Sequence, residues 1–498
     1  MLRSGMRNLM RDSMFIKSYA LLISIPLLFI TTDVKEVYTL TSVETLFSQS
    51  KQYFNTHETK ELKFRKKRLK ALSHSIRNHE KDLLEALAKD LGKNEVEAYA
   101  TEIGFVLKNI KTARKELKNW AKRKQINTPL YMFPAKSYIM KEPYGTVLII
   151  GPYNYPFQLV IEPLIGAIAA GNTAIIKPSE YTPHVSAVIE TLISEAFEPQ
   201  YVTTVQGDAA VTETLLDLPF DYIFFTGSEK VGRSVYEKAS KQLTPVTLEL
   251  GGKSPVIVDE TANIKVASER ICFGKFVNAG QTCIAPDYIL VDRKVQSQLV
   301  LALKTTIQEF YGAHSQQSED YGRIVNDKHF MRLNDLVQTH HADVVFGGDT
   351  DRDDRYIGPT LIENMTANAK IMQEEIFGPL LPIITYDTFD EAIEFVHKYP
   401  KPLSLYLFSE DENATDRILN EVSFGGGAIN DTLMHITNPS LPFGGVGHSG
   451  IGAYHGKYSF DTFSHKKSYT FKTTRLESSL LFPPYKGKVK YIKAFFNN

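Results

Sequence analysis

The sequence has only two cysteines in 498 residues, Cys272 and Cys283. The two could in principle pair, but the lack of a repeated spacing favours reduced thiols in a reducing compartment. Without a Cys-x-x-Cys spacing or a clustered histidine partner, they cannot make a zinc site alone. Cys272 stands in the apolar stretch RICFGKF, which is typical of a core position. Cys283 stands instead in NAGQTCIAPD, a polar turn marked by glycine, so we interpret it as a candidate nucleophile.

The sequence also lacks an excess of positive or negative residues. Lysine plus arginine and aspartate plus glutamate number 57 each, so the charge balance gives no support to a nucleic-acid partner. The composition, 43% hydrophobic and 23% charged, is that of a folded chain with a core, and the length predicts two or three domains.

The apolar run YALLISIPLLFI, residues 19–30, is too short to cross a membrane comfortably and contains Pro26. Basic residues precede it, as in a signal peptide, but no small-x-small cleavage site follows. Residues 1–40 are therefore interpreted as a leader, with three alternatives: an export signal, a membrane-surface anchor or a non-functional extension. Export is the least favoured of these. The folded part is expected to begin at Thr41, where Thr-x-x-Glu has the spacing of a capping box.

The pattern of apolar residues changes along the chain. Up to about Lys124 it has helical spacing, and the charges of EKDLLEALAKDLGK, residues 80–93, are expected on a solvated face. Residues 129–143 predict extended segments that project from the body. Short buried runs that alternate with helical sequence then predict a parallel sheet with a ligand crevice at its carboxyl edge, and a second such block begins at Ser254.

Two side chains near predicted strand ends suit chemistry at a thiol. Glu249 closes the strand-like VTLE ahead of Gly251-Gly252, and a partly buried glutamate there could activate water, although a surface carboxylate at a turn is the alternative. Asn154 follows the strand VLII, and its amide could donate to an oxyanion, although a turn-capping asparagine is the alternative.

A dinucleotide site is indicated without the Gly-x-Gly-x-x-Gly fingerprint, which this region lacks. Lys177 and Glu180 in IIKPSE follow a strand and suit the hydroxyls of an adenosine ribose, and the carboxylate disfavours a 2′-phosphate. In FTGSEKVG, Gly227, Ser228 and Gly232 predict a helix start whose free N–H groups could face a pyrophosphate.

Taken in order, the motifs GPYNYPF, KPSE, FTGSEKVG, ELGGKSP, GQTCIAP, EEIFGP and PFGGVGHSG resemble those of the NAD(P)-dependent aldehyde dehydrogenase superfamily. PYNYP, APDY and GAYHGKYSFDTFSH resemble its class 3 branch. The likeness extends from about Thr41 to the C-terminus. It implies an α/β fold of three parts: a Rossmann-type NAD-binding domain (41–128 and 144–248), an α/β catalytic domain (249–450), and a small β oligomerisation extension (129–143 and 464–476), followed by a basic and aromatic tail (477–498).

The resemblance also implies roles for individual residues. Cys283 would be the nucleophile, Glu249 the base for thioester hydrolysis, and Asn154 with the Cys283 N–H the oxyanion hole. Lys177 and Glu180 would lie at the adenosine ribose, Gly227, Ser228 and Gly232 near the dinucleotide, and Glu375 with Phe377 around the nicotinamide. The cofactor would be NAD, with NADP possible. No metal is implied, and Cys272, His435, His448, His455 and His465 are interpreted as structural.

The implied reaction is oxidation of a lipophilic aldehyde, long-chain aliphatic, aromatic or of carotenoid type, to its acid. Two alternatives are a coenzyme A-acylating dehydrogenase, against which Glu249 argues, and a non-catalytic protein with the same fold. Class 3 relatives form dimers, so a homodimer is expected. We expect a cytoplasmic protein. KGKVKYIKAFF in the tail alternates lysines with apolar residues, which fits peripheral binding to an anionic membrane surface; the alternative is a tail packed across the body or a partner subunit.

Overall fold

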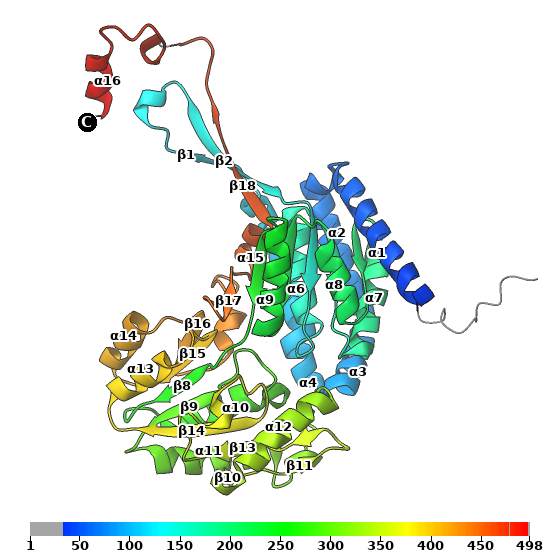
Figure 1. The fold of residues 1–498 in the computed structure, drawn as a ribbon, viewed down its shortest axis with the longest axis vertical. Coiled ribbons are helices and arrows are strands. Elements are labelled where there is room, and N and C mark those ends of the chain that lie inside the picture. The colour runs from blue at the N-terminus through cyan, green and yellow to red at the C-terminus, as the bar shows by residue number, and fades with distance from the viewer. Residues whose placement is uncertain (1–32, 478, 497–498) are drawn as a thin grey trace, which may run out of the picture.

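The computed structural model describes residues 33–477 and 479–496. Two α/β lobes lie one above the other in Figure 1, and a thin arm of strands projects from the upper lobe. Each lobe is built around its own sheet, with helices packed against it. Of the leader predicted at residues 1–40, residues 1–32 lie outside the described residues, and residues 33–40 form the start of the first helix.

The upper lobe contains a six-stranded sheet that is parallel except for one edge strand. Its order is β17 (Gly450–Ile451), β7 (Val246–Glu249), β6 (Tyr222–Thr226), β3 (Thr146–Ile150), β4 (Thr173–Lys177) and β5 (Val202–Thr204). The chain runs outward from β3 in one direction through β4 and β5 and in the other through β6 and β7. The boundary between β3 and β6 is therefore a topological switch point, where ligands bind at the carboxyl ends of strands.

The crossover helices of this lobe are α6 (Gln158–Ala170), α7 (Pro183–Ala196), α8 (Ala209–Asp217) and α9 (Glu229–Lys241). They are joined by the N-terminal helices α1 (Asp33–Phe54), α2 (Leu62–Asn78), α3 (Glu80–Leu91), α4 (Glu95–Ala98) and α5 (Gly104–Trp120). Helix α1 begins at Asp33, so the expected start at Thr41 is wrong. The sequence DVKEVYTL contains no proline or glycine that would end a helix before Thr41.

The lower lobe contains a seven-stranded sheet, parallel except for its edge strand β10. Its order is β10 (Val344–Phe346), β13 (Thr360–Ile362), β14 (Leu380–Tyr386), β9 (Tyr288–Asp292), β8 (Pro255–Val258), β15 (Ser404–Phe408) and β16 (Gly426–Ile429). Its helices are α10 (Ile264–Phe276), α11 (Gln296–Tyr311), α12 (Asp327–Thr339), α13 (Phe389–His397) and α14 (Glu412–Glu421). A two-stranded ribbon, β11 (Thr350–Asp351) and β12 (Tyr356–Ile357), lies beside them.

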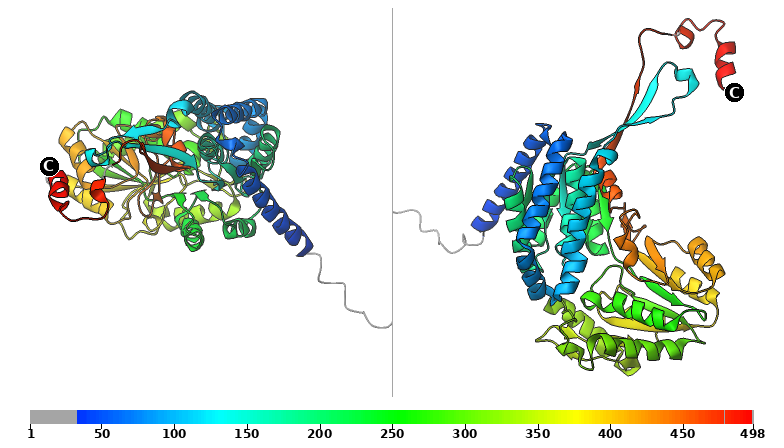
Figure 2. Two further views of the ribbon diagram at one scale, coloured as in Figure 1. Left: turned by 90° about the horizontal axis from the view of Figure 1, so that it is seen from above. Right: turned by 180° about the vertical axis from the view of Figure 1, so that it is seen from behind.

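The arm is a three-stranded antiparallel sheet of β1 (Lys124–Ile126), β2 (Lys136–Pro143) and β18 (Ser464–Phe471). It begins at Lys124, earlier than the boundary at 129, because β1 pairs with β2. Before β18, helix α15 (Lys457–Thr462) packs against α6. The tail carries helix α16 (Val489–Phe496) back beside the tip of the arm (Figures 1 and 2), where the rings of Tyr131 and Phe496 lie 5.9 Å apart.

The pairing of the strands confirms the predicted parallel sheets. As expected for strands covered on both faces, β3, β4, β6, β9 and β15 are buried along their whole length. The charges of residues 80–93 do not all face solvent. Asp90 accepts the backbone N–H of Val185 at 2.9 Å, and Lys93 is likewise buried. Lys93 follows the left-handed cap Gly92, which takes the chain off the exposed face of α3.

Candidate active site

Cys283 lies on a turn between α10 and β9. The turn Val277–Gly280 contains two non-glycine residues in the left-handed region, Asn278 (φ 53°) and Ala279 (φ 51°). Cys283 is half-buried whereas Cys272 is fully buried, so the contrast expected from the sequence is confirmed. Burial, together with the nearby Glu375 and Glu249 carboxyls, raises the pKa of the Cys283 thiol. A proton acceptor is therefore needed to form the thiolate.

The turn that carries Cys283 is held by the side chain of Gln281. Its Nε2 donates to the carbonyls of Asn278 and Arg323, each at 3.0 Å, and its Oε1 accepts the N–H of Val325 at 3.0 Å. Both ends of one buried amide are thus satisfied, which fixes a strained backbone next to the thiol.

Glu249 is the last residue of β7, at the carboxyl edge of the upper sheet, as predicted. It is 2% exposed, deeper than the partly buried position that the sequence suggested. Neither of its carboxyl oxygens has a hydrogen-bond partner within the described part of the chain. Burial without a partner raises the pKa of Glu249 well above its usual value, because a charged carboxylate is poorly solvated there.

Asn154 lies beyond the end of β3, as predicted, and its loop is tied to the Cys283 turn. The Asn154 carbonyl accepts Nδ2 of Asn278 at 2.8 Å, and the hydroxyl of Tyr155 is 2.8 Å from Oγ1 of Thr282. The Asn154 side chain has no hydrogen-bond partner among residues 33–477 and 479–496. Its amide is therefore available to a ligand beside the thiol.

Glu375 approaches the same site from the loop before β14. A buried ion pair of Lys253 and Asp287 holds this loop: Asp287 accepts the N–H of Ile376 at 2.9 Å, and Lys253 donates to the carbonyl of Glu374 at 3.0 Å. Burial, and then the charge of Asp287, raises the pKa of Glu375 to about 8. Phe377, two residues on, has a left-handed backbone (φ 49°).

The predicted coenzyme residues occupy strand ends near the switch point of the upper sheet. Lys177 ends β4, and its Nζ lies 2.6 Å from Glu180, whose side chain is one-third exposed. Ser228 caps α9 by accepting the N–H of Val231 at 3.4 Å. A Cβ on Gly232 would lie 2.6 Å from Leu250, so this glycine allows α9 to pack closely on the sheet. An ammonium and a carboxylate for ribose hydroxyls, followed by a capped helix start, fit a dinucleotide.

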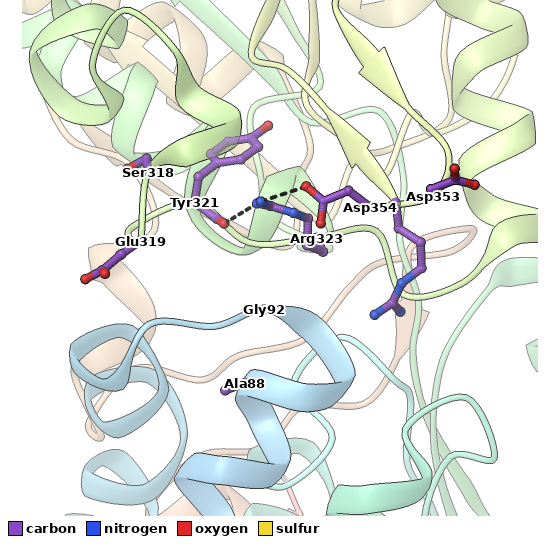
Figure 3. A pocket seen from close by; sticks show the side chains of 9 residues that line it. Ala88, Gly92, Ser318, Glu319, Tyr321, Arg323, Asp353 and Asp354 are labelled. Atoms are coloured by element: carbon purple, nitrogen blue, oxygen red, sulfur yellow. Dashed lines mark hydrogen bonds and ion pairs between the residues drawn. The ribbon is translucent and has the colours of Figure 1, made fainter.

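A polar hollow of about 400 Å³ lies at the seam between the lobes (Figure 3). Ala88 and Gly92 of the upper lobe face Tyr321, Arg323 and Asp354 of the lower lobe across it. The N–H of Arg323 donates to the carbonyl of Leu91 at 2.7 Å, and its guanidinium lies 3.0 Å from Asp354. The hollow therefore belongs to the contact between lobes, and none of its lining residues is a candidate for chemistry.

Within the described ranges, no group of three or more His, Cys, Asp or Glu side chains could hold a metal ion. No helix there is both long enough and apolar enough to span a membrane.

The structure brings together several residues that the sequence did not single out. Lys93, Glu102, Lys253 and Asp287 form two buried ion pairs beside the loops of the site. Lys253 stands within ELGGKSP and Asp287 within APDY, so both were inside recognised motifs. Lys93 and Glu102 carried no such signal, because charged residues at helical spacing are usually exposed.

Comparisons with known proteins agree with this geometry. The model of the aldehyde dehydrogenase family matches residues 33–469. The 4,4'-diaponeurosporen-aldehyde dehydrogenase of Staphylococcus aureus is 68% identical over 92% of this chain and 99% of its own. The dimeric NADP-preferring aldehyde dehydrogenase of Rattus norvegicus is 44% identical over 90% and 99%.

Among solved structures, the substrate-bound state of Staphylococcus aureus AldH superimposes with a TM-score of 0.90 at 68% identity, over 91% of this chain and 99% of that one. These findings favour aldehyde oxidation over the acylating and non-catalytic alternatives. The chain therefore belongs to the aldehyde dehydrogenase family and is an NAD(P)-dependent enzyme that oxidises an aldehyde to its carboxylic acid.

Proposed function

We propose that Cys283, Glu249 and Asn154 carry out this oxidation on a lipophilic aldehyde of long-chain or polyisoprenoid type. The single observation that carries the assignment of residues is the convergence of three strand-end or turn positions on one thiol. Burial, then the Glu375 and Glu249 carboxyls, raises the pKa of Cys283, and hydrogen bonds join the Asn154 loop to the Cys283 turn.

Cys283 attacks the aldehyde carbon and forms a thiohemiacetal. Because the thiol pKa is raised, a base must take its proton, and Glu375 in its ionised form accepts it as the sulfur reacts. The former carbonyl oxygen becomes an oxyanion that the Asn154 amide and the Cys283 N–H stabilise. Such a donor contributes roughly 3–4 kcal/mol where its effect has been measured by removal.

Lys177 and Glu180 would hold the adenosine ribose of the coenzyme, and Glu375 with Phe377 would lie at its nicotinamide. NAD(P)⁺, when bound, supplies the two-electron acceptor for the conversion of the thiohemiacetal to a thioester. Glu249 then removes a proton from water, and the water attacks the thioester carbon. The acid leaves, and the Cys283 thiol is restored.

The proposed substrate class rests on the surroundings of the thiol and on a relative. Cys283 packs against a buried apolar cluster that includes Leu433, Phe443 and Tyr454. Apolar walls with a few polar groups are typical of sites for lipophilic ligands. The relative at 68% identity is named for a carotenoid-type aldehyde. We extend that substrate class to this chain.

The test is a steady-state assay of the full chain with NAD⁺ or NADP⁺ and aldehydes from acetaldehyde to a long-chain and a polyene aldehyde. We expect kcat/KM to rise along the series and Cys283→Ala to abolish NADH formation. A flat or falling series would overturn the substrate class alone. Turnover that survives Cys283→Ala would overturn the assignment of the nucleophile.

We further propose a homodimer in which the arm contacts the second copy, and peripheral binding of a cytoplasmic enzyme to membranes through the tail. The arm supports the first proposal, since it projects from the body and exposes Leu130 and Phe133 at its tip. A monomeric mass in solution would count against the dimer.

A further inference from the structure

A buried ion pair of Lys93 and Glu102 lies beside the loop that carries Asn154, and the proposed mechanism leaves it without a role. Lys93 Nζ and Glu102 Oε1 are 2.5 Å apart, and neither side chain has exposed surface. Taking two charges out of water costs several kcal/mol per ion unless further hydrogen bonds compensate. The groups that form these further hydrogen bonds with Lys93 and Glu102 show which segment the ion pair holds in place.

Glu102 holds the end of the Asn154 loop. Its Oε2 accepts the backbone N–H groups of Phe157 at 2.9 Å and Gln158 at 3.1 Å. These N–H groups lie at the start of α6, where helical donors lack partners within the helix. A carboxylate is stabilising at this end of a helix, so Glu102 fixes the point at which the loop enters α6.

Lys93 holds the middle of the same loop. Its Nζ donates to the carbonyl of Asn154 at 3.0 Å and lies 4.0 Å from the ring centre of Tyr155. The same carbonyl accepts Nδ2 of Asn278 from the Cys283 turn. Two donors from different segments therefore set the backbone position of Asn154, and the Tyr155–Thr282 hydrogen bond adds a third link.

Two irregularities of the backbone bring the pair inward. Glu102 lies in a π-helical turn, Tyr99–Ile103, inserted between α4 and α5. Such turns are rare and occur frequently at functional sites. Lys93 directly follows the left-handed Gly92 (φ 66°) at the end of α3. Glu102 therefore faces Lys93 from within the π turn, and Lys93 faces it from the residue after the helix cap.

We propose that Lys93 and Glu102 are positioning residues that hold the oxyanion-stabilising amide of Asn154 against the Cys283 turn. This inference rests on the proposed role of Asn154. Neither residue touches the thiol or the coenzyme residues in the structure, so both act through the loop. Misplacement of a reacting group by about 1 Å can cost about 100-fold in rate, which sets the size of the expected effect.

The experiment is a double-mutant cycle on the full chain, with a long-chain aldehyde and NAD⁺. Lys93→Met is expected to lower kcat about 100-fold, while the Kd for NADH, measured by fluorescence, changes less than about threefold. Lys93→Arg, which keeps the charge and the donors, is expected to recover at least about tenfold of that loss. In an Asn154→Ala background, Lys93→Met should have no further effect on kcat.

A purely structural role predicts a different pattern, in which Lys93→Met lowers kcat by the same factor with or without Asn154. That result would overturn the inference while leaving Asn154 in place. If Asn154→Ala alone leaves kcat unchanged, the proposed oxyanion hole fails and this inference fails with it.

Lys141→Met is the matched control, since it removes an ion pair with Asp461 near the base of the arm. It should leave kcat within about twofold. If Lys93→Met does not fold, Glu102→Gln replaces it in the cycle, because the amide keeps an oxygen for the N–H groups of Phe157 and Gln158. Additive losses for Glu102→Gln and Asn154→Ala would overturn the inference equally well.

Discussion

The carboxyl of Glu375 lies where the side chain of residue 251 would be if that residue were not glycine. A Cβ built on Gly251 would lie 2.1 Å from Oε2 of Glu375, well inside contact distance. Gly251 lies two residues after β7 of the upper sheet ends at Glu249, whereas Glu375 comes from the lower lobe. The absence of one side chain thus lets the two lobes approach each other at the proposed nicotinamide side of the site.

Gly251→Ala is expected to lower stability by about 1–3 kcal/mol, the usual cost of overpacking, and, by displacing Glu375, to weaken coenzyme binding. The measurement is the Kd for NADH by fluorescence. Gly426→Ala is the control, since a Cβ there would contact His435 only at 3.4 Å. Unchanged NADH affinity in Gly251→Ala would show that Glu375 has no part in holding the coenzyme.

The reactivity of Cys283 should depend on pH in a defined direction. Burial, then the charges of Glu375 and Glu249, raises the pKa of this thiol, so the thiolate forms only as the pH rises above the value for an ordinary cysteine. Alkylation of Cys283 by iodoacetamide, followed by mass spectrometry, should therefore accelerate up to at least about pH 9.

Glu375→Gln should shift this alkylation profile to lower pH. It removes a negative charge that disfavours the thiolate, and above pH 8 that carboxyl is ionised in the wild type. Glu374→Gln, at the exposed neighbouring position, is the matched control and should leave the profile in place. Identical profiles for all three proteins would mean that the charge of Glu375 does not reach the thiol.

Replacement of Glu249 should separate the formation of the thioester from its hydrolysis. Burial raises the pKa of this carboxyl, and a general base must be ionised to act. Hydrolysis of the thioester should therefore speed up with pH. Glu249→Gln should give one burst of NADH and then turn over about 100- to 10,000-fold more slowly. Loss of the burst as well as turnover would contradict a role limited to hydrolysis.

The Lys253–Asp287 pair offers a test of stability. Asp287→Asn would leave a buried ammonium without its charge partner, which typically costs about 3–5 kcal/mol. Thermal unfolding of the variant should show a clear fall in Tm. A Lys253→Met and Asp287→Leu double variant should recover much of that loss, because no uncompensated charge remains. A double variant less stable than Asp287→Asn would contradict this account.

The parts of the site that could be predicted from sequence are those marked by local features. Glu249 and Lys177 end short buried runs, so their place at a sheet edge follows from the pattern of burial. Ser228 is the N-cap of α9, and a serine at this position is a local signal for the start of a helix. The place of each of these three residues in the fold depends on only a few neighbours along the chain.

The parts that could not be predicted depend on contacts between distant segments. Glu102 faces Lys93 from a π turn that no residue type marks, and the sequence alone indicates a solvated helix there. Thr41 has the spacing of a capping box yet lies inside α1, since nothing before it ends the helix. The depth of Glu249 depends on the antiparallel strand β17, which returns from about 200 residues further along the chain.

The tail has two candidate binding partners, a membrane surface and a second subunit. Phe482, Tyr485 and Tyr491 are exposed, and four lysines, Lys486, Lys488, Lys490 and Lys493, lie among these apolar side chains. Each lysine near an anionic lipid surface contributes about 1 kcal/mol, so replacing all four by glutamine should reduce binding to phosphatidylserine vesicles at least about 100-fold at low salt.

The measurement is co-sedimentation of the full chain, its four-glutamine variant and a version ending at residue 476, each with anionic and with neutral vesicles. The solution mass of each protein is recorded alongside. Retained dimer mass with lost vesicle binding would assign the tail to the membrane. Loss of the dimer on truncation, with no vesicle binding by the full chain, would instead assign the tail to the partner subunit, because exposed apolar side chains at the tip of the arm would then be buried between copies.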